Sequence, residues 1–430
     1  MRAFVKTSIS YVLQMESRAV LWKYKPKVIA ITGSLGKTST KDAVYAALSG
    51  MTHVRKSQKS YNSEIGLPLT ILGLPNGWNN PFVWFENFLL GLWLIIAPHK
   101  YPKWLVLEVG VGKPGDMKKT ASWLKTDAVI ITAIGETPAH IEFFSSRKHL
   151  IEEKSELIKT LKKDGLLVLN ADDEAVLGMK EKTKCRTITY GFNPEADVVA
   201  SQDNIYYGID GIPEGIIFRV DESGVSMPVA IEGVFGRNHL YASLAAITLS
   251  VGLKFNVLHA IEHLKAYDVP AGRMRLLSGI NDTFIIDDTY NSSPFACESA
   301  LRTLREVNGG RKIAILGDML ELGKHTVEAH KNVGKVAKEN ADILVVVGPR
   351  ACDIKVGAIE AGMSEGSIFD FTNSTEAGAF AEKLLEKNDL VLVKGSQGVR
   401  MERVVSAILK DKKNQNRLLV RQEPEWLEKK

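Results

Sequence analysis

The sequence predicts an α/β protein in which a larger domain, with a mostly parallel sheet and a small β-rich insert, precedes a Rossmann-like domain. Three observations support this prediction. Apolar runs typical of buried parallel strands alternate with helical patterns at residues 27–31, 104–109, 128–134 and 166–169. Short alternating segments with Gly, Asp and Pro turns indicate the insert at residues 186–231. Strand patterns then recur at residues 283–287, 312–316, 342–347 and 390–393.

Helical patterns complete the prediction and divide the chain. Helices are expected over residues 8–24, 38–48 and 239–265, and the first has an apolar stripe of Ile9, Val12, Leu13, Val20 and Leu21. Pro270 and Gly272 interrupt the pattern, which suggests a domain boundary. We expect an N-terminal helical segment (1–26), a central domain (27–272), a C-terminal domain (273–412) and a charged, partly mobile tail (413–430).

Composition narrows the class of protein. With 45% hydrophobic and 24% charged residues among 430, the chain is unlike disordered, collagenous or multi-span membrane proteins. Its net charge of +5 gives no indication of nucleic-acid binding. The three cysteines form no C-x-x-C pair, which disfavours a zinc ribbon or disulfides and favours a reducing cytoplasm. The first residues lack the continuous apolar run of a secretory signal.

The sharpest motif is ITGSLGKTST at residues 31–40, between a predicted strand and a predicted helix. Glycines let a backbone wrap a phosphate chain, and a helix N-terminus adds N–H donors and the positive end of the helix dipole. Lys37 would then reach the β- and γ-phosphates, and Thr38 would hold Mg²⁺. Ile31 stands where the usual pattern has its first glycine, so the generic match is incomplete. The alternative, a glycine-rich turn with a surface lysine, is disfavoured because strand, turn and helix agree.

Glu108 and His140 each follow a predicted strand of the same sheet. A carboxylate at the C-terminal end of such a strand points into the crevice where α/β proteins bind ligands, and its oxygens suit Mg²⁺. A carboxylate that faces water and a structural histidine are the alternatives. The residues alone leave both open.

Lys154 lies on the apolar stripe of a predicted helix, at helical spacing from Leu150, Ile151, Leu157 and Ile158. A lysine on a buried stripe is costly unless it is paired, neutral or modified. A side chain that reaches water from the edge of the stripe is the alternative.

Polar clusters also follow strands of the second domain, at residues 286–294, 317–319 and 393–396. Each alone could be a βα turn with capping residues. Together they would line one edge of the second sheet, as a binding face should.

These segments resemble the Mur ligases, ATP-dependent amide-bond ligases of peptidoglycan synthesis. The resemblance begins near residue 27 and covers nearly all of the chain in family order: 31–40, 61–72, 107–117, 137–146, 152–158, 169–174, 285–294, 315–323 and 392–405. It accounts for the incomplete phosphate motif, because the family uses a shorter T-G-S-x-G-K-T form. The segments at 285–294 and 392–405 are typical of the muramoyl-tripeptide branch.

The resemblance implies an ADP-forming ligase that joins a D-alanyl-D-alanine-like dipeptide to a muramoyl-peptide carboxylate through an acyl-phosphate. The implied ATP-binding residues are Gly33, Ser34, Leu35, Gly36, Lys37, Thr38, Ser39, Arg273, Asp288 and Asn291. The implied catalytic residues are Lys37, Glu108, His140 and Lys154. Two Mg²⁺ ions would be held by Thr38, Glu108, His140 and a carbamylated Lys154. Substrate would contact Asn62, Lys394 and Ser396.

The chain departs from this branch in three respects. The branch has a separate N-terminal domain that recognises the UDP-sugar, whereas about 27 residues precede the first strand here. Ala242 replaces the asparagine that contacts adenine in the family. An aromatic-rich stretch at residues 76–103 is longer than expected.

Two other functions stay open on sequence alone. One is a related ligase of the folylpolyglutamate or cyanophycin synthetase type, and the other is a non-catalytic nucleotide-binding regulator of wall synthesis. Intact Lys37, Glu108 and Lys154 argue against the second. We expect a cytoplasmic monomer that acts on a small-molecule or carrier-linked muramoyl-peptide and a D-amino-acid dipeptide, without a nucleic-acid partner.

Residues 78–104 contain four of the seven tryptophans and the uncharged run FLLGLWLIIA. A run of that length is too short to span a bilayer, which needs about 20 apolar residues. A buried helix is the favoured interpretation. The alternative is a segment that lies at the inner membrane surface or closes over a lipid-linked substrate, because Trp and Tyr favour that boundary.

Overall fold

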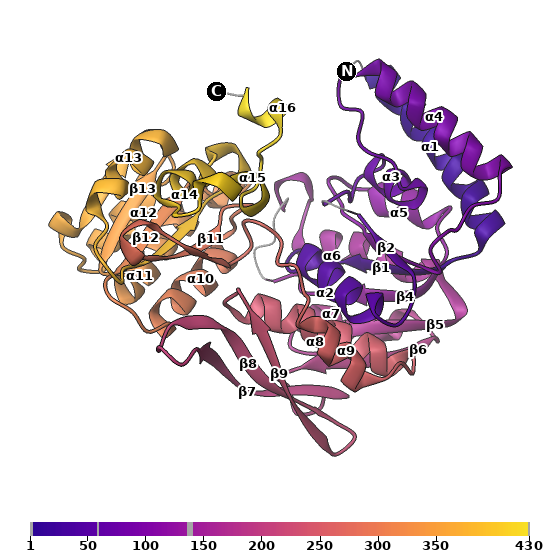
Figure 1. The fold of residues 1–430 in the computed structure, drawn as a ribbon, viewed down its shortest axis with the longest axis horizontal. Coiled ribbons are helices and arrows are strands. Elements are labelled where there is room, and N and C mark those ends of the chain that lie inside the picture. Colours follow the sequence, from indigo (N-terminus) through magenta and orange to yellow (C-terminus); the bar gives the residue numbers. More distant parts are fainter. Residues whose placement is uncertain (1–2, 58–59, 136–140, 429–430) are drawn as a thin grey trace.

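The computed structural model describes residues 3–57, 60–135 and 141–428. It confirms the predicted α/β architecture, with two sheets side by side (Figure 1). The strand order is β2-β3-β1-β4-β5-β6-β7-β8-β9 in the first sheet and β10-β11-β15-β12-β13-β14 in the second. Strands β2 to β7 pair in parallel, β7 to β9 are antiparallel, and β10 is the antiparallel edge of an otherwise parallel second sheet.

The first sheet consists of β1 (Lys27–Thr32), β2 (Val54–Lys56), β3 (Trp104–Glu108), β4 (Thr126–Ile131), β5 (Leu161–Asn170), β6 (Arg186–Gly191), β7 (Val198–Tyr207), β8 (Pro213–Glu222) and β9 (Val225–Glu232). Its helices are α1 (Ala3–Tyr24), α2 (Lys37–Ser49), α3 (Gly66–Leu72), α4 (Pro81–Ile96), α5 (Asp116–Ala121), α6 (Arg147–Ser155), α7 (Glu174–Leu177), α8 (Arg237–Gly252) and α9 (Val257–Leu264). The apolar runs of β1, β3, β4 and β5 are buried because helices cover both faces of this part of the sheet.

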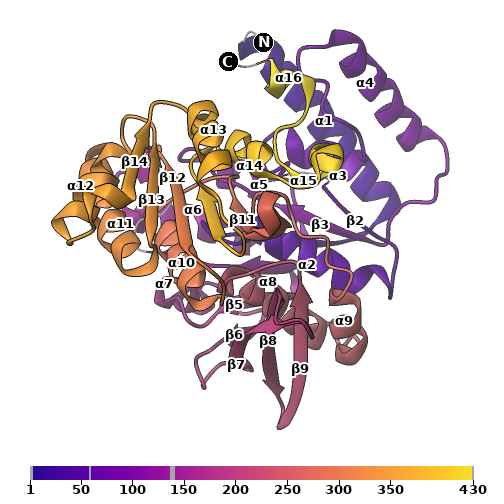
Figure 2. The same cartoon turned by 60° about the vertical axis from the view of Figure 1, so that its left-hand side comes forward.

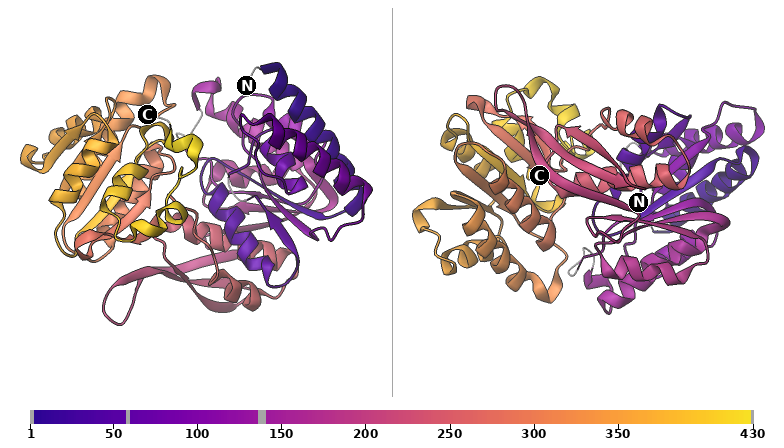
Figure 3. Two further views of the ribbon diagram at one scale, coloured as in Figure 1. Left: turned by 45° about the horizontal axis from the view of Figure 1, so that its top comes forward. Right: turned by 90° about the horizontal axis from the view of Figure 1, so that it is seen from below.

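The second sheet consists of β10 (Arg275–Ser278), β11 (Phe284–Asp288), β12 (Lys312–Gly317), β13 (Ile343–Val347), β14 (Ile368–Phe371) and β15 (Leu390–Lys394). Its helices are α10 (Pro294–Glu306), α11 (Thr326–Asn340), α12 (Cys352–Glu360), α13 (Ser374–Leu384), α14 (Glu402–Ile408), α15 (Gln415–Leu418) and α16 (Pro424–Leu427). Seen from below, the long strands β7 to β9 run from the first domain under the second (Figure 3). The Asn308 N–H donates to the Tyr207 hydroxyl, 2.9 Å away, at this contact. We propose that the boundary between the two domains lies between Gly272 and Arg273, in the linker that joins the two sheets.

Three expectations are corrected. The predicted helix over 239–265 is two helices, because the first ends at Gly252 and Lys254 adopts a left-handed φ of 60° before Asn256 caps the second. In the tail, which we expected to be charged and partly mobile, Leu419 and Arg421 are buried, and Leu419 packs in the core of the C-terminal domain. In the N-terminal helix, Val12 is exposed whereas Ile9, Leu13 and Val20 are buried.

The interpretation of residues 78–104 as a plain buried helix is also wrong. Figures 1 and 2 show α4 beside α1 on the outside of the first domain. Only Trp84, Asn87 and Gly91 of α4 are fully buried, whereas a stripe of large apolar side chains faces outward. Periodicity could not reveal this, because apolar residues occur on all sides of the helix. No helix in the described part of the chain is both long and apolar enough to cross a bilayer.

Candidate active site

The carboxyl ends of four neighbouring strands form the edge of the first sheet at which the predicted site lies. The phosphate loop follows β1, Glu108 ends β3, Thr132 follows β4 and Asn170 ends β5. Strand β1 lies between β3 and β4, and Ile31 pairs with Glu108. The parallel pairing therefore places the loop between the acidic end of β3 and the hydroxyl that follows β4.

The loop at residues 33–36 depends on glycine. Gly33 has a φ of 149°, and a Cβ there would lie 1.9 Å from the Thr132 hydroxyl oxygen. The backbone N–H groups of Ser34 and Leu35 donate to the Ala133 carbonyl at 2.7 and 3.0 Å. Gly36, with a φ of 76°, then directs the chain into α2. A larger side chain at 33 would displace the loop from the end of β4.

Lys37 and Thr38, at the start of α2, lie where the motif predicts. The Lys37 ammonium donates to the carbonyls of Gly33 at 2.9 Å and Ser34 at 3.3 Å. Burial lowers the pKa of Lys37, an effect that Glu108 opposes and Arg273 adds to. The Thr38 hydroxyl is 3.0 Å from the Ser60 hydroxyl. Ser60 belongs to this site, although its own segment carries no signal that predicts it.

Lys154 is buried, as the helical periodicity predicted, with 4% of its surface exposed. Its ammonium donates to the Gly33 carbonyl at 2.9 Å. Burial, and then the neighbouring charge of Lys37, hold the pKa of Lys154 well below the usual value. The structure thus brings a helix far along the chain to the phosphate loop. A lysine in such surroundings is readily neutral, which is the form that reacts with CO₂.

Glu108 is 1% exposed, so it does not face water. The Asn62 side-chain amide donates to its Oε1 at 3.0 Å. Its other oxygen, Oε2, is buried and has no hydrogen-bond partner among the described residues. A buried carboxylate oxygen without a partner is costly, and a cation there would remove the cost. A carboxylate oxygen suits a hard divalent ion such as Mg²⁺. The roles of Glu108 and Thr38 as its ligands stay predictions.

The residues that the structure describes supply few ligands for a metal ion. Within those ranges, no three His, Cys, Asp or Glu side chains lie close enough to hold an ion together. His140 lies outside the described residues. Its predicted role as a ligand therefore stays a prediction.

The second domain contributes Arg273, Asp288 and Asn291 to a narrow cavity that also borders Ser34, Gly36 and Ser39 of the first domain. The Arg273 guanidinium stacks on the Tyr290 ring at 3.9 Å and donates to the Thr38 hydroxyl at 3.4 Å. Its Nε is buried and has no hydrogen-bond partner in the described ranges. The predicted ATP-binding residues of the two domains therefore face one another.

Asn62, Lys394 and Ser396, the predicted substrate residues, have partners within the protein. Asn62 orients Glu108. Lys394 is buried and pairs with Asp288 at 2.6 Å, and the Ser396 hydroxyl accepts from the Leu320 N–H at 2.9 Å. Direct contact between these residues and substrate stays a prediction.

A larger open pocket of about 760 Å³ continues from Leu35 and Gly36 toward α8. We did not predict most of its lining, which includes Asn170, Asp172, Asp173, Tyr190, Asn238 and Tyr241. The polar residues that follow β5 were the available signal. Ala242 lies here, and Asn238, one turn earlier on α8, borders both this pocket and the narrow cavity. The neighbouring His239 is buried, where its Nδ1 lies 3.0 Å from the Tyr267 hydroxyl.

A phosphate loop, a buried carboxylate behind it and a second domain that faces it define an ATP-dependent α/β enzyme. The chain belongs to the Mur ligase family: residues 31–250 match the Mur ligase middle domain and residues 272–397 match the Mur ligase, glutamate ligase domain. It is therefore an ATP-dependent peptide ligase.

Relatives within the family are similar over most of the chain. The UDP-N-acetylmuramoyl-tripeptide–D-alanyl-D-alanine ligase of Bacillus subtilis is 28% identical over 404 residues, which cover 92% of this chain and 79% of that enzyme. The Escherichia coli enzyme of the same name is 27% identical over 388 residues, covering 89% and 76% of the two chains. The MurF ligase of Thermotoga maritima, solved with ADP, has a TM-score of 0.76 and 26% identity, covering 93% of this chain and 83% of its own.

Proposed function

We propose that this Mur ligase joins a D-alanyl-D-alanine-like dipeptide to the carboxylate of a muramoyl-tripeptide, with ATP cleaved to ADP and phosphate. The names of the related enzymes support this choice of substrates. The observation that carries the proposal is the convergence of Lys37, Lys154 and Glu108 behind one phosphate loop. A nucleotide-binding regulator without activity has no use for two buried lysines and a buried carboxylate at this place.

ATP would lie along the two connected cavities. Residues 33–39 would hold its phosphates through backbone N–H groups and Lys37, and Arg273, Asp288 and Asn291 would face them from the second domain. The larger pocket would take the base. Asn238 borders it with an amide group, so we propose that Asn238 supplies the adenine contact that Ala242 cannot make.

Thr38, Glu108, His140 and a carbamylated Lys154 would hold two Mg²⁺ ions. When bound, these ions would neutralise charge on the transferring phosphoryl group. Carbamylation of Lys154 joins its neutral amine to CO₂ and releases a proton, which turns a buried cation into an anionic ligand. Burial of the Lys154 amine favours the neutral form that this reaction needs.

The reaction has two steps. An oxygen of the substrate carboxylate attacks the γ-phosphorus, the bond to the β-phosphate oxygen breaks, and an acyl-phosphate and ADP result. The neutral amine of the dipeptide then attacks the acyl carbon, phosphate leaves, and the amine loses a proton. Lys37 and Arg273 would offset the charge that develops on the phosphoryl oxygens, and the second domain would exclude water from the acyl-phosphate.

The proposed function is tested by phosphate release across a panel of acceptor and amine pairs. We expect release with UDP-MurNAc-tripeptide and D-alanyl-D-alanine together, and little with either alone. Release with a folate and glutamate, or with an aspartate polymer and arginine, would assign the chain to another Mur-type ligase. No release with any pair, at full ATP binding, would indicate a regulator.

We also propose that the enzyme is a cytoplasmic monomer that lies on the inner face of an anionic membrane through the exposed side of α4. Six large apolar side chains on this side are 48–83% exposed: Phe82, Phe85, Leu89, Leu92, Trp93 and Ile96. Their spacing places them on one stripe of the helix. Such an aromatic-rich stripe is typical of helices that lie in the bilayer interface.

Helix α4 packs against α1, and its C-terminal end is hydrogen-bonded to that helix. The Lys23 ammonium of α1 donates to the carbonyls of Leu94 at 3.1 Å and Ile95 at 2.9 Å, at the end of α4. The surroundings favour an anionic surface, because four basic side chains are exposed on α1, just after α1 and after α4: Arg18, Lys25, Lys100 and Lys103. Glu86 is the one acidic residue of α4.

Sedimentation with vesicles of phosphatidylglycerol and phosphatidylcholine tests this contact. We expect the wild type to pellet and the variant Phe85→Ser/Leu89→Ser/Trp93→Ser to stay in solution with ATP binding intact. The matched control is Ile209→Ser/Ile212→Ser, which removes exposed apolar side chains from the β7–β8 turn and should pellet like the wild type. A wild type that stays in solution, or that forms a dimer through α4, would contradict the proposal.

A further inference from the structure

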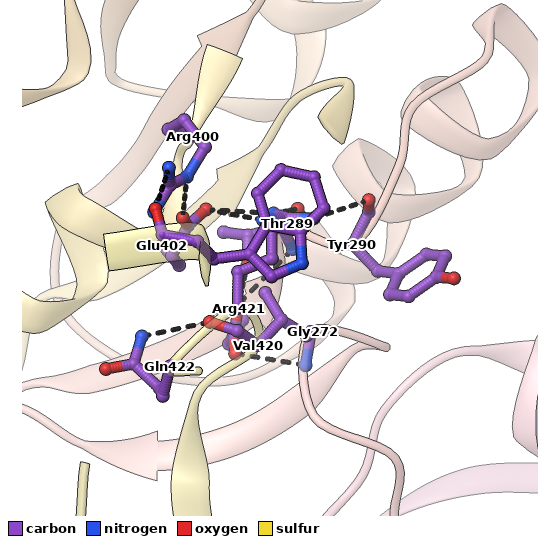
Figure 4. A network of polar contacts seen from close by, with 10 residues as sticks. Gly272, Thr289, Tyr290, Arg400, Glu402, Val420, Arg421 and Gln422 are labelled. Atoms are coloured by element: carbon purple, nitrogen blue, oxygen red, sulfur yellow. Dashed lines mark hydrogen bonds and ion pairs between the residues drawn. The ribbon is translucent and has the colours of Figure 1, made fainter. Parts of the chain in front are cut away.

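The last residues of the chain return to the linker between the two domains. After α15, Leu419 and Arg421 are buried, with 4% and 7% of their surfaces exposed. Figure 4 shows the Arg421 side chain beneath the turn that carries Thr289 and Tyr290. A charged side chain rarely occupies such a place unless several groups satisfy it.

Arg421 is fully engaged by two segments. Its Nε and Nη2 donate to Oε2 of Glu402 at 3.0 and 2.9 Å, in a charge-assisted pair. Its Nη1 donates to the Tyr290 carbonyl at 3.1 Å, and its Nη2 also donates to the Thr289 carbonyl (Figure 4). Arg421 thus ties the tail to the turn after β11.

Glu402 is the shared anion of this cluster. It is 1% exposed and also accepts from the Arg400 guanidinium, which donates in turn to the Trp426 carbonyl at 2.7 Å. Arg400, Glu402 and Arg421 therefore link the segment after β15, the tail and the 289–290 turn. Removing one member of a buried ionic cluster leaves the others without a partner, which is strongly unfavourable.

The 289–290 turn is itself bonded to the linker. The Tyr290 N–H donates to the Gly272 carbonyl at 3.0 Å, and the Gly272 N–H donates to Oδ2 of Asp287 at 3.1 Å. A Cβ at Gly272, where φ is 68°, would lie 2.9 Å from the Tyr290 nitrogen and 3.0 Å from Cγ1 of Val420. The turn, the linker and the tail are therefore in close contact with one another at Gly272.

Arg273 is the next residue along the linker. The Tyr290 ring lies 3.9 Å from its guanidinium carbon, and the guanidinium reaches the Thr38 hydroxyl at 3.4 Å. A continuous series of contacts therefore runs from Arg421 through the Tyr290 turn to Arg273 and the phosphate loop. We infer that Arg421 is a positioning residue, which fixes Arg273 against the bound nucleotide without touching it.

This inference rests on the proposed nucleotide site but not on the identity of the acceptor or amine. It is tested by a double-mutant cycle on the Kd for MgATP, measured by calorimetry for the wild type, Arg421→Ala, Arg273→Ala and the double variant. A hydrogen bond to a charged group contributes about 1.5–3 kcal/mol, so we expect Arg273→Ala to weaken binding at least tenfold. Arg421→Ala should weaken binding several-fold alone and by less than about twofold in the Arg273→Ala background.

Two further variants separate positioning from general damage to the fold. Arg417→Ala removes an exposed arginine from the same tail and should leave the Kd unchanged. Arg421→Lys keeps the charge beside Glu402 but cannot donate to both carbonyls. It replaces Arg421→Ala in the cycle if that variant does not fold. It should then show the same loss of MgATP affinity and the same dependence on Arg273.

Equal losses in both backgrounds, or no loss in either Arg421 variant, would overturn the inference and leave the proposed function intact. A wild type that binds MgATP but ligates nothing would overturn the proposed function and leave the cycle interpretable. A wild type that does not bind MgATP would overturn both.

Discussion

Lys37 and Lys154 donate to the same backbone oxygen: the ammonium nitrogen of each lies 2.9 Å from the Gly33 carbonyl. Two cations cannot share a buried oxygen without strong repulsion. Burial lowers the pKa of both, and the charge of Lys37 lowers that of Lys154 further. This arrangement disfavours two charged lysines side by side, and it supports our proposal of a cationic Lys37 beside a carbamylated Lys154.

Lys37→Ala is expected to abolish ligation, with a loss of at least about 1,000-fold in kcat. Phosphoryl transfer depends mainly on charge and positioning around the phosphates, and this variant removes the cation of the phosphate loop. ATP-dependent phosphate release in the presence of both substrates is the measurement. The control Lys118→Ala removes an exposed lysine of α5 and should retain activity. Turnover of Lys37→Ala near the wild-type rate would place the nucleotide elsewhere.

Lys154→Ala should be inactive and partly restored by millimolar formate or acetate, because a small carboxylate can occupy the place of the carbamate. The same assay, with and without added carboxylate, is the measurement. Lys148→Ala changes an exposed lysine of the same helix and should need no rescue. Full activity of Lys154→Ala without an additive would remove Lys154 from the mechanism.

Asn62→Ala should raise the Mg²⁺ concentration for half-maximal activity by about 10-fold or more, since groups that orient a metal ligand commonly matter this much. The reason is that Asn62 donates to Glu108 and leaves its other oxygen for the ion. A Mg²⁺ titration of the initial rate measures the effect, with Asn79→Ala, an exposed asparagine, as the control. An unchanged titration curve would show that Glu108 does not depend on Asn62.

The Glu16 carboxyl should make the stability of the packed helices α1 and α4 depend on pH. It lies against Gly91, its Oε2 has no hydrogen-bond partner within the described residues, and burial raises the pKa of Glu16 from 4.5 to about 7. Between these values the native state binds more protons than the unfolded state, so the free energy of unfolding falls as the pH rises and then levels off.

Glu16→Gln removes this charge and should therefore raise the Tm more at pH 8 than at pH 5. Thermal unfolding at the two pH values, compared with the wild type, is the measurement. Glu86→Gln, on the exposed side of α4, serves as the matched control. A gain in Tm that is equal at both pH values would contradict the role of Glu16.

The phosphate loop and the burial of Lys154 could be predicted because their signals are local. Glycine, lysine and a helical pattern within ten residues define the loop, and the spacing of four apolar residues places Lys154 on a buried stripe. The partner of Lys154 could not be predicted, because Gly33 approaches it only when β1 and α6 pack in the fold.

Two other features were hidden for physical reasons. Helix α4 is apolar on all sides, so its sequence does not say which side is covered. The tail is rich in charge and we expected it to be partly mobile, although Arg421 pairs with a buried anion, Glu402. Periodicity reports the environment of a side chain only when one face of the element differs from the other.

The central claim is that the acceptor carboxylate attacks the γ-phosphate, and an isotope experiment tests it most directly. The muramoyl-tripeptide is labelled with ¹⁸O in the carboxylate that forms the amide, then incubated with ATP, Mg²⁺, D-alanyl-D-alanine and the enzyme. Phosphate and nucleotide are analysed by mass spectrometry. The account predicts ADP and one ¹⁸O atom in each phosphate released with peptide product. Unlabelled phosphate, or labelled AMP with pyrophosphate, would contradict it.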